Sequence, residues 1–420
     1  MKHLSPAARE RTLLLTLAGI QFTHIVDFMV MMPLGPQFTR LFGISDAQFG
    51  LLVSAYTLAA GAAGLGATGF IDRFERKTLL LWAYLAFGIA TLACGLADSY
   101  AMLMAARIAA GLFGGLIGTL VQTIVGDAIP FERRGRAMGV VMASFSLATV
   151  AGVPASLWLA QAFGWHGTFI AIAVASFAIA ALGLRTLPRI DAHLHAGVGS
   201  RWSALAAVLR EPNHWRAFGL SALVMSAGFT TIPFLTIYMT SNVGIALDDV
   251  PLVYLAGGVA TLFTARWIGV LADRWGKVRT FRFVAAGSIV PLLLATSLGA
   301  VPLWVLLIVT TLFFVLVSGR MVPAMALVTQ ATVPALRGTF MSLNSCVQSV
   351  AMGVASLIGG LLISRDAAGR VEGYMHNGWL AVAMTLLMLW WVGRLRTEPS
   401  GAPVAWTADG GKAAPGTVAD

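Results

Sequence analysis

The sequence is poor in charged residues and nearly free of cysteine. Charged residues make up 11% of its 420 positions, whereas soluble domains average about 25%, so the chain lacks the charge that an ordinary water-facing surface needs. The two cysteines, Cys94 and Cys346, fall in separate apolar stretches and predict buried thiols rather than a disulfide framework. These two scarcities exclude a typical soluble protein and a disulfide-stapled scaffold.

Motifs for cofactor chemistry are also missing. The sequence contains no Walker loop, no zinc-ligand spacing and no nucleophile elbow. It therefore gives no support for ATP-driven pumping, metal binding or catalysis, and we expect neither a cofactor nor an enzyme activity.

Long apolar runs are abundant instead. Hydrophobic residues make up 58% of the chain and the mean hydropathy is +0.82, and a run of about 20 apolar residues crosses the ~30 Å hydrocarbon core as a helix. The pattern predicts an all-α membrane protein with twelve transmembrane helices in two pseudo-symmetric six-helix bundles. The predicted spans are 13–34, 49–71, 79–97, 102–125, 137–160 and 168–187, then 218–239, 252–271, 281–300, 303–328, 340–363 and 378–392.

The spans divide the chain into four regions. An N-terminal bundle covers 1–187 and a C-terminal bundle covers 216–397, with a linker at 188–215 between them. Trp202, Leu205 and Leu209 recur at helical spacing in this linker and predict an amphipathic helix on the membrane surface. Residues 398–420 lack apolar periodicity and predict a disordered cytoplasmic tail.

The placement of the basic residues predicts the orientation in the membrane. A net charge of +10 is compatible with nucleic-acid binding, but the cations cluster in short loops on the side that holds the N-terminus. Of the 28 Lys and Arg residues, only Arg40, Arg365 and Arg370 fall on the opposite side. The positive-inside rule therefore predicts that both termini are cytoplasmic. The first apolar run continues past Met32 and predicts a span rather than a cleaved signal peptide.

A charged turn occurs twice, about half the chain length apart. Residues 269–279 read Gly-Val-Leu-Ala-Asp-Arg-Trp-Gly-Lys-Val-Arg, and residues 69–77 form a less regular copy in which Glu75 stands in place of a glycine. A second pair of similar segments, 135–138 and 338–341, opens the fifth and eleventh spans at nearly the same offset. The repeats indicate a duplicated membrane protein whose halves meet around a central site, as in transporters.

These motifs resemble those of the major facilitator superfamily, and in particular its drug:proton antiporter-like, arabinose-efflux-permease-like members. The resemblance covers almost the whole chain and implies alternating access, with the substrate held between the two six-helix halves and usually coupled to proton entry. The first charged turn departs from the family pattern at Glu75. The segments that carry the resemblance are 269–279, the Arg-x-x-x-Gly motif at 107–111, the turn at 127–135, Gly152-Val-Pro154 and residues 164–169.

Asp27 is the strongest candidate for proton coupling, because it is the one acid that falls deep inside a predicted span. A buried carboxylate is costly unless it is paired, hydrated or protonated, so it can exchange a proton when its surroundings alternate. The alternative is a permanent structural ion pair with a buried arginine. His24 shares a helix face with Asp27 and is a candidate relay or a packing residue.

Two arginines lie inside predicted spans. Arg107 matches a motif that the resemblance links to proton coupling, and its alternative role is a lock to backbone carbonyls or to Asp127. Arg320 is a candidate for the substrate cavity, where it could bind an anionic group or pair with Asp27. Polar residues that could line the same cavity, or bond one another across helices, are Tyr56, Gln122, Tyr238, Asn344 and Gln348.

Glycines and charged turns complete the predicted machinery. Two overlapping Gly-x-x-x-Gly pairs, 111/115 and 114/118, predict close helix packing, and Gly152-Val-Pro154 predicts a bend. The charged turns predict a conformational switch that holds helix ends in one state and releases them in the other, although three cations in a short loop also fix topology. The switch residues are Asp72, Arg73, Arg76, Asp273, Arg274, Gly276 and Lys277.

The sequence favours a secondary transporter of the bacterial inner membrane that exports a small molecule in exchange for protons and works as a monomer in the lipid bilayer, without nucleic acid. Two alternatives stay open: a proton-coupled importer of a sugar or organic anion, and a transport-dead membrane receptor or assembly protein.

Overall fold

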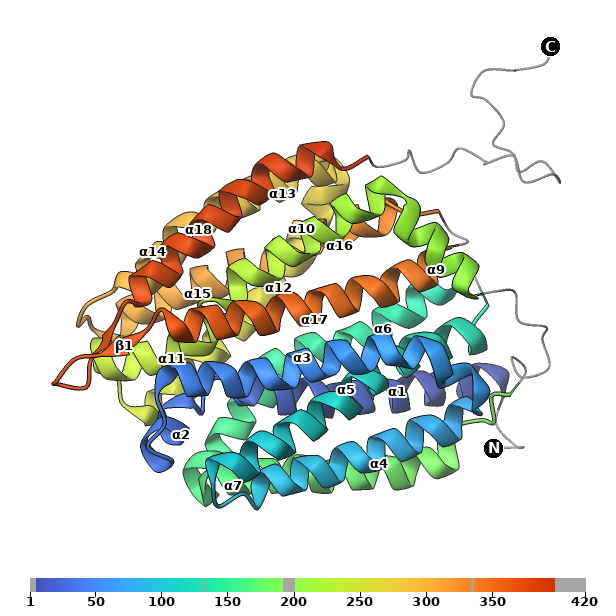
Figure 1. Ribbon diagram of the computed structural model, residues 1–420, viewed down its shortest axis with the longest axis horizontal. Coiled ribbons are helices and arrows are strands. Elements are labelled where there is room, and N and C mark those ends of the chain that lie inside the picture. Colours follow the sequence, from blue (N-terminus) through green and yellow to red (C-terminus); the bar gives the residue numbers. More distant parts are fainter. Residues whose placement is uncertain (1–4, 131–132, 192–200, 334–335, 397–420) are drawn as a thin grey trace, which may run out of the picture.

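Long helices run roughly side by side through the molecule, so that α1 begins and α18 ends at the same face (Figure 1). The computed structural model describes residues 5–130, 133–191, 201–333 and 336–396. We call the face at which α1 begins and α18 ends the termini face, and the face at the other end of the helices the opposite face. In the described part of the chain, eleven helical segments are long and apolar enough to span a membrane.

The first half of the chain is helical apart from short turns. Its α3 begins at a capping box, in which Ser45 and Gln48 each bond the other's backbone N–H. Its elements are α1 (Pro6–Val30), α2 (Gly35–Leu41), α3 (Asp46–Phe70), η1 (Ile71–Arg73), α4 (Arg76–Gly95), α5 (Tyr100–Ala128), α6 (Arg134–Leu147), the π-helical turn η3 (Ala148–Gly152) and α7 (Val153–Thr186).

The α7 segment contains a chain reversal. Gly164 has φ +74° and ψ 167°, which interrupts the helix, and the Thr168 hydroxyl donates to the Ser156 carbonyl at 2.8 Å. In a continuous helix these residues would lie ~18 Å apart. The candidate span Arg134–Thr186 therefore crosses twice, and the molecule has the twelve spans that the sequence predicts.

The second half repeats the six-span plan. Its elements are α9 (Arg201–Arg210), α10 (Pro212–Phe229), η4 (Ile232–Phe234), α11 (Leu235–Tyr238), η5 (Met239–Val243), η6 (Leu247–Asp249), α12 (Val250–Trp275), α13 (Lys277–Gly287), α14 (Ile289–Ser297), α15 (Leu303–Gly319), α16 (Met321–Gln330), α17 (Arg337–Leu361), the strands β1 (Ser364–Arg365) and β2 (Val371–Glu372), α18 (Tyr374–Trp391) and η8 (Val392–Arg394). The antiparallel β1–β2 hairpin and the short α2 were not predicted.

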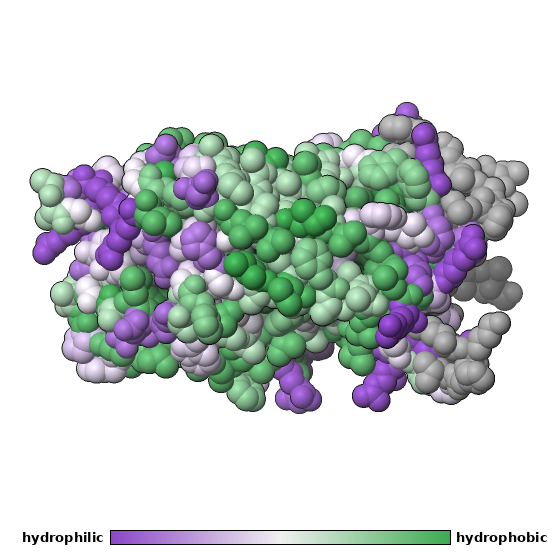
Figure 2. All heavy atoms as spheres, turned by 90° about the horizontal axis from the view of Figure 1, so that it is seen from below, coloured by the Kyte–Doolittle hydropathy of each residue, from purple (hydrophilic) through white to green (hydrophobic). Residues whose placement is uncertain are grey.

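Large apolar side chains are exposed on the outer surface of the helices. Trp82, Phe163 and Phe263 are 67%, 73% and 70% exposed. The visible side shows a hydrophobic middle with hydrophilic residues gathered toward both ends (Figure 2). Such a surface is stable against hydrocarbon and not against water, as a multi-pass membrane protein requires.

Local packing confirms one predicted glycine contact and corrects another. A Cβ at Gly111 or Gly115 would lie 2.3 Å from the Tyr56 carbonyl oxygen or 2.2 Å from that of Ala60, so this pair does bring α5 against α3. Gly118 meets nothing within 4 Å, so its predicted packing role is wrong. In the linker, residues Arg201–Arg210 form helix α9, in which Val208 is buried, Leu205 packs against the core and Leu209 is 41% exposed.

Other predictions have simple outcomes. Cys94 and Cys346 are free and buried, and Gly152 closes the π-helical turn in the span where a bend was expected. The side chain of Trp202 and the predicted tail at 398–420 lie outside the described residues.

Candidate functional site

A buried ion pair joins α1 and α5. The Arg107 Nη1 lies 2.8 Å from the Asp27 Oδ2, and both side chains are fully buried. The same nitrogen reaches the Asp27 backbone carbonyl at 3.4 Å. The sequence left the partner of Asp27 open between two arginines, and the structure shows that Arg107 is the partner.

The aromatic ring of Tyr56 covers the other side of this arginine. The Arg107 guanidinium carbon lies 4.2 Å from the centre of the Tyr56 ring, which is a cation–π distance. A Cβ at Gly114 would lie 2.7 Å from both the Tyr56 hydroxyl and His24 Nε2. The glycines of α5 are therefore what allow Tyr56 and His24 to approach the ion pair.

Hydrogen bonding within this cluster is incomplete. Asp27 Oδ1, Arg107 Nε and Nη2, the Tyr56 hydroxyl and His24 Nδ1 are buried and have no hydrogen-bond partner among the described residues. A buried ion pair stabilises a protein only when its remaining donors and acceptors are satisfied. The protein groups described here therefore satisfy the Asp27–Arg107 pair only in part.

His24 lies beside the ion pair without bonding to it. Its ring stacks on Tyr56 at 6.3 Å between centroids and meets the edge of Phe87 at 5.8 Å. The predicted shared face of His24 and Asp27 is confirmed, and its immediate contacts are aromatic.

Arg320 lies in a different place. It sits between α15 and α16, is fully buried, and donates to Thr385 Oγ1 at 3.3 Å and to Ser288 Oγ and the Val224 carbonyl at 3.5 Å. These partners all belong to the second half, and no carboxylate pairs with Arg320 in the described part of the chain. The predicted alternative of an Arg320–Asp27 pair is wrong for this conformation.

The other polar residues predicted for the cavity do not form one cluster. The Tyr238 hydroxyl donates to the Leu298 carbonyl at 2.9 Å and its ring packs on Tyr374 at 4.8 Å, near the opposite face. Gln348 Nε2 lies 3.6 Å from the Met325 sulfur. Asn344 is 1% exposed, and Gln122 is half-buried.

The first charged turn is fastened to α5. Arg76 is buried, its Nε lies 2.9 Å from the Asp127 Oδ2, and its Nη1 donates to the Ile71 carbonyl at 2.7 Å. Asp127 thus pairs with Arg76, and the predicted alternative of a lock between Arg107 and Asp127 is wrong. Arg73 is exposed, and the Asp72 side chain lies outside the described residues.

Glu75 caps α4 and binds the start of the linker. Its carboxylate accepts from the backbone N–H groups of Lys77, Thr78 and Ile190 at 3.0, 2.8 and 2.8 Å. The Arg76 N–H donates in return to the Ile190 carbonyl at 3.2 Å. Partial burial raises the pKa of the Glu75 carboxyl, but these hydrogen bonds lower it by a larger amount. The net pKa therefore lies below its ordinary value.

The second charged turn has a different conformation. Gly276 has φ +89°, which a residue with a Cβ rarely adopts, whereas Glu75 at the matching position has φ −63°. Asp273 and Arg274 are exposed and Lys277 is half-buried. The two turns therefore differ in kind: the second depends on a glycine with positive φ, whereas the first is closed by the capping carboxylate of Glu75.

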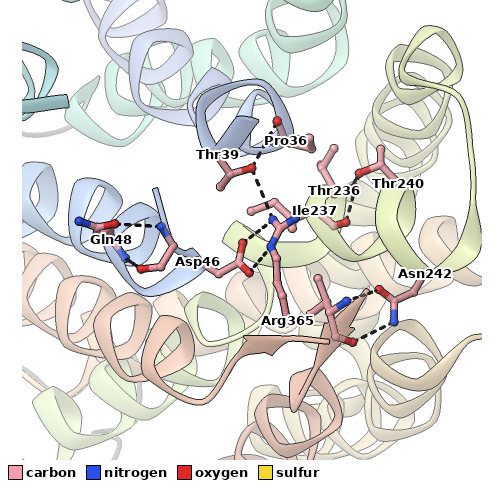
Figure 3. A network of polar contacts seen from close by, with 11 residues as sticks. Pro36, Thr39, Asp46, Gln48, Thr236, Ile237, Thr240, Asn242 and Arg365 are labelled. Atoms are coloured by element: carbon pink, nitrogen blue, oxygen red, sulfur yellow. Dashed lines mark hydrogen bonds and ion pairs between the residues drawn. The ribbon is translucent and has the colours of Figure 1, made fainter. Parts of the chain in front are cut away.

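A second ion pair links the two halves at the opposite face (Figure 3). Arg365 of the β1–β2 hairpin donates from Nε and Nη2 to the two carboxylate oxygens of Asp46, each at 2.8 Å. Asn242 holds the hairpin by exchanging two hydrogen bonds with Val371, at 2.8 and 2.9 Å. The sequence analysis considered Arg365 only as a guide to membrane topology. The signal that could have identified its role was that cations are scarce on this side of the membrane.

Close packing extends this closure along α3 and α17. The Ser54 hydroxyl donates to the Gly353 carbonyl at 2.7 Å, and a Cβ at Gly50 would lie 2.8 Å from the Ser356 carbonyl oxygen. Gly258 of α12 packs in the same way against Thr149, at 2.8 Å. Nearer the termini face, Gly61 and Gly64 of α3 would still meet Val350 and Cys346 of α17, at 3.1 and 3.0 Å, whereas Gly118, Gly126, Gly139 and Gly338 would meet nothing within 4 Å.

Twelve spans in two similar halves, joined at one face, with an ion pair buried beside their interface, are typical of a membrane transporter. The chain belongs to the Major Facilitator Superfamily, whose family model matches residues 17–234 and 217–414. It is a multi-pass membrane protein of a transporter family, and its relatives are transporters rather than enzymes.

The curated relatives are distant. The chain is 24% identical to an MFS-type transporter, YtbD, of Bacillus subtilis, over 81% of this chain and 85% of that protein. It is 26% identical to a chloramphenicol resistance protein of Streptomyces lividans, over 57% and 61%. It is 22% identical to a probable sugar efflux transporter of Pasteurella multocida, over 84% and 86%.

Solved structures share the fold. A D-xylose–proton symporter superposes with a TM-score of 0.74 at 16% identity, over 94% of this chain and 99% of that one. A bacterial homologue of the human lysosomal transporter Spinster, in an inward-facing and unoccupied conformation, gives 0.73 at 16% identity, over 93% and 97%.

Proposed function

We propose that the protein exports a small molecule in exchange for protons, with Asp27 as the site that takes up the proton. The observation that carries this proposal is the buried Asp27–Arg107 ion pair, with its donors and acceptors only partly satisfied. Proton uptake by Asp27 removes the negative charge that Arg107 faces. The guanidinium is then buried without a counter-ion, which disfavours the conformation described above.

Orientation and conformation follow from charge and packing. Because Arg40, Arg365 and Arg370 are the only Lys or Arg residues of the described chain in segments between spans at the opposite face, we assign the termini face to the cytoplasm. The closed face is then the outer one, and the conformation is inward-facing. The curated relatives are bacterial, which supports a place in a bacterial inner membrane.

The direction of transport is argued from the relatives. Two of them carry names that denote resistance or efflux, whereas the symporter is similar in fold alone. Proton entry on an inside-negative membrane gains about 2.3 kcal/mol per charge per 100 mV, which is sufficient to drive accumulation outside. We place the substrate between the halves and keep Arg320 as a candidate for a substrate anion.

The charged turns act in the conformational change in this scheme. The Arg76–Asp127 pair fastens the first turn in the inward-facing state, while the second turn, with Asp273, Arg274, Gly276 and Lys277, is free to engage when the cytoplasmic face closes. We expect Asp273→Asn to lower turnover without changing which substrate is recognised. A changed substrate range at normal turnover would contradict this role.

The proposal is tested with purified protein in proteoliposomes that contain a pH-sensitive dye. Radiolabelled chloramphenicol and a radiolabelled pentose serve as probes, and either should move against its gradient when a proton gradient is imposed. Proton movement should accompany it, and Asp27→Asn should abolish the coupling. Undiminished coupled transport by Asp27→Asn would refute the role of Asp27.

Two alternatives give distinct results. An importer would move its probe inward together with protons, and a transport-dead receptor would move neither probe while remaining folded. The proposed monomer is checked by light scattering of the detergent-solubilised protein, in which a doubled protein mass would contradict it.

A further inference from the structure

We infer that Tyr56, Phe28 and Phe229 form an aromatic stack that transmits the breaking of the Asp27–Arg107 ion pair to the second half of the molecule. The three side chains act as positioning residues in proton coupling. The inference rests on the proposed function and extends it to residues that take no part in binding the proton.

The stack is continuous from the ion pair to the other half. The Arg107 guanidinium lies 4.2 Å from the Tyr56 ring, the Tyr56 ring stacks on Phe28 at 5.3 Å, and Phe28 stacks on Phe229 at 5.9 Å. The two ring pairs are inclined by only 23° and 21°. Both distances are within the range of attractive aromatic pairs.

The first half holds its end of the stack tightly. Tyr56 is 3% exposed, and its backbone lies so close to α5 that a Cβ at Gly111 would be 2.3 Å from the Tyr56 carbonyl oxygen. Phe28 directly follows Asp27 in α1. Movement of Arg107 or of α1 therefore changes the face that Phe28 presents to the second half.

The second half receives the stack at a break in a helix. Phe229 is the last residue of α10, and the chain continues through Thr230 and Thr231 into the short η4. The Phe229 carbonyl also accepts from the Ser356 hydroxyl of α17 at 3.4 Å. Phe229 thus lies where α10 and α17 both meet the first half, and where the regular helix α10 ends.

The charge change that starts the motion is local. When a proton from solution joins the Asp27 carboxylate, the ion pair to Arg107 is lost and the guanidinium keeps its charge. The titratable groups that face this pair are His24 on α1, Tyr56 on α3 and Cys94 on α4. Arg107 then keeps the Tyr56 ring at 4.2 Å and the Asp27 backbone carbonyl at 3.4 Å as close contacts, so its displacement is communicated through Tyr56 to Phe28 and Phe229.

The experiment follows the outer face with spin labels and needs no substrate. Asp98→Cys and Ala300→Cys place labels on exposed loop residues of the two halves at that face, while the native thiols are buried. The distance between labels is measured in lipid nanodiscs from low to high pH. We expect acid to convert the short-distance population into a longer one.

Phe229→Leu is the test variant and Phe234→Leu is its matched control. Phe234 also packs across the interface, edge-on to Phe49 at 6.2 Å, but lies outside the stack. Phe229→Leu should reduce the pH-dependent change in the population ratio by roughly fivefold, the lower end of typical coupling between sites. Phe234→Leu should shift the populations equally at every pH and keep the pH response.

The outcomes separate the two claims. A normal pH response in Phe229→Leu, or an equal loss in Phe234→Leu, would overturn the stack while leaving proton coupling intact. Absence of any pH response in the parent protein would overturn the proposed proton coupling and the stack with it. Tyr56→Phe should behave like the parent, because the ring and not the hydroxyl makes these contacts.

Discussion

The two halves of this chain each bury one arginine at the corresponding span, the fourth and the tenth, but they treat its charge differently. Arg107 faces a carboxylate at 2.8 Å, whereas Arg320 is held only by hydroxyls and a carbonyl at 3.3 to 3.5 Å. An ion pair can be switched by a proton, and an arginine among neutral groups cannot. The comparison shows that the two halves hold a buried cation in different ways, by a carboxylate in the first half and by neutral groups in the second.

The charged turns differ in the same way. The first turn is tied by the Arg76–Asp127 pair and by the carboxylate of Glu75, while in the second turn Asp273 and Arg274 are exposed. The half with the less regular family motif therefore has the more elaborate contacts. Sequence regularity alone would have suggested the reverse.

The largest predicted effect comes from removing one member of the ion pair. Asp27→Asn leaves Arg107 buried without a counter-ion, which should destabilise the inward-facing state by about 3–5 kcal/mol. Thermal unfolding of the purified protein measures this. Adding Arg107→Met should restore stability but not proton-coupled transport. If Asp27→Asn alone is stable and still couples transport to protons, the two halves do not differ in how they use their buried arginine.

The ion pair between the halves should have the next largest effect. Arg365→Ala leaves Asp46 buried, and loss of its charged hydrogen bonds should favour opening of the outer face by about 1.5–3 kcal/mol. The distance between spin labels at Asp98→Cys and Ala300→Cys, measured in lipid nanodiscs, reports the opening. Arg370→Ala in the same hairpin is the control and should have no effect, and exchange of the two charges, Asp46→Arg with Arg365→Asp, should reverse part of it.

The charged turns provide a third test. Arg76→Ala removes the ion pair to Asp127 and the bond to the Ile71 carbonyl, so we expect a loss of about 1–3 kcal/mol. Lys277→Ala in the second turn should stay within ~0.5 kcal/mol of the parent. Chemical unfolding of both variants makes the comparison, and equal losses would show that the turns are equivalent in this state.

Arg320 should tolerate replacement far better than Arg107. Because Arg320 makes only long bonds to neutral groups, Arg320→Met should change the free energy of unfolding by about 1 kcal/mol or less, whereas Arg107→Met leaves Asp27 unpaired. Thermal unfolding of the two variants decides. A large loss in Arg320→Met would mean that its charge is as finely balanced as that of Arg107.

The smallest effect concerns pH and Glu75. Because hydrogen bonds lower the folded pKa of Glu75 below its ordinary value, its stabilisation is present above that ordinary value and is lost as the pH falls through the folded pKa. Glu75 is partly exposed, so we expect less than about 1 kcal/mol. Acid unfolding of Glu75→Gln should lack this contribution, and identical acid profiles would contradict the cap.

Much of the fold was predictable because span length and hydrophobicity are local properties. Each predicted span ends within several residues of the observed helix ends, and the break at Gly164 separates the fifth span from the sixth. The site was only partly predictable. Asp27, Arg107, His24 and Tyr56 were all selected, but their grouping depends on helix rotation, which a uniformly apolar span does not encode.

The sequence by itself determined that the chain spans a membrane twelve times, that it is duplicated, and that Asp27 must be paired, hydrated or protonated, because a bare charge is costly to bury in hydrocarbon. Only the tertiary structure decided that the partner is Arg107, that Arg320 stays within its own half, that Glu75 caps α4, and that Asp46 and Arg365 close the opposite face. These choices follow from how closely helices approach at glycines such as Gly111, and contacts between distant segments appear only when the helices are packed.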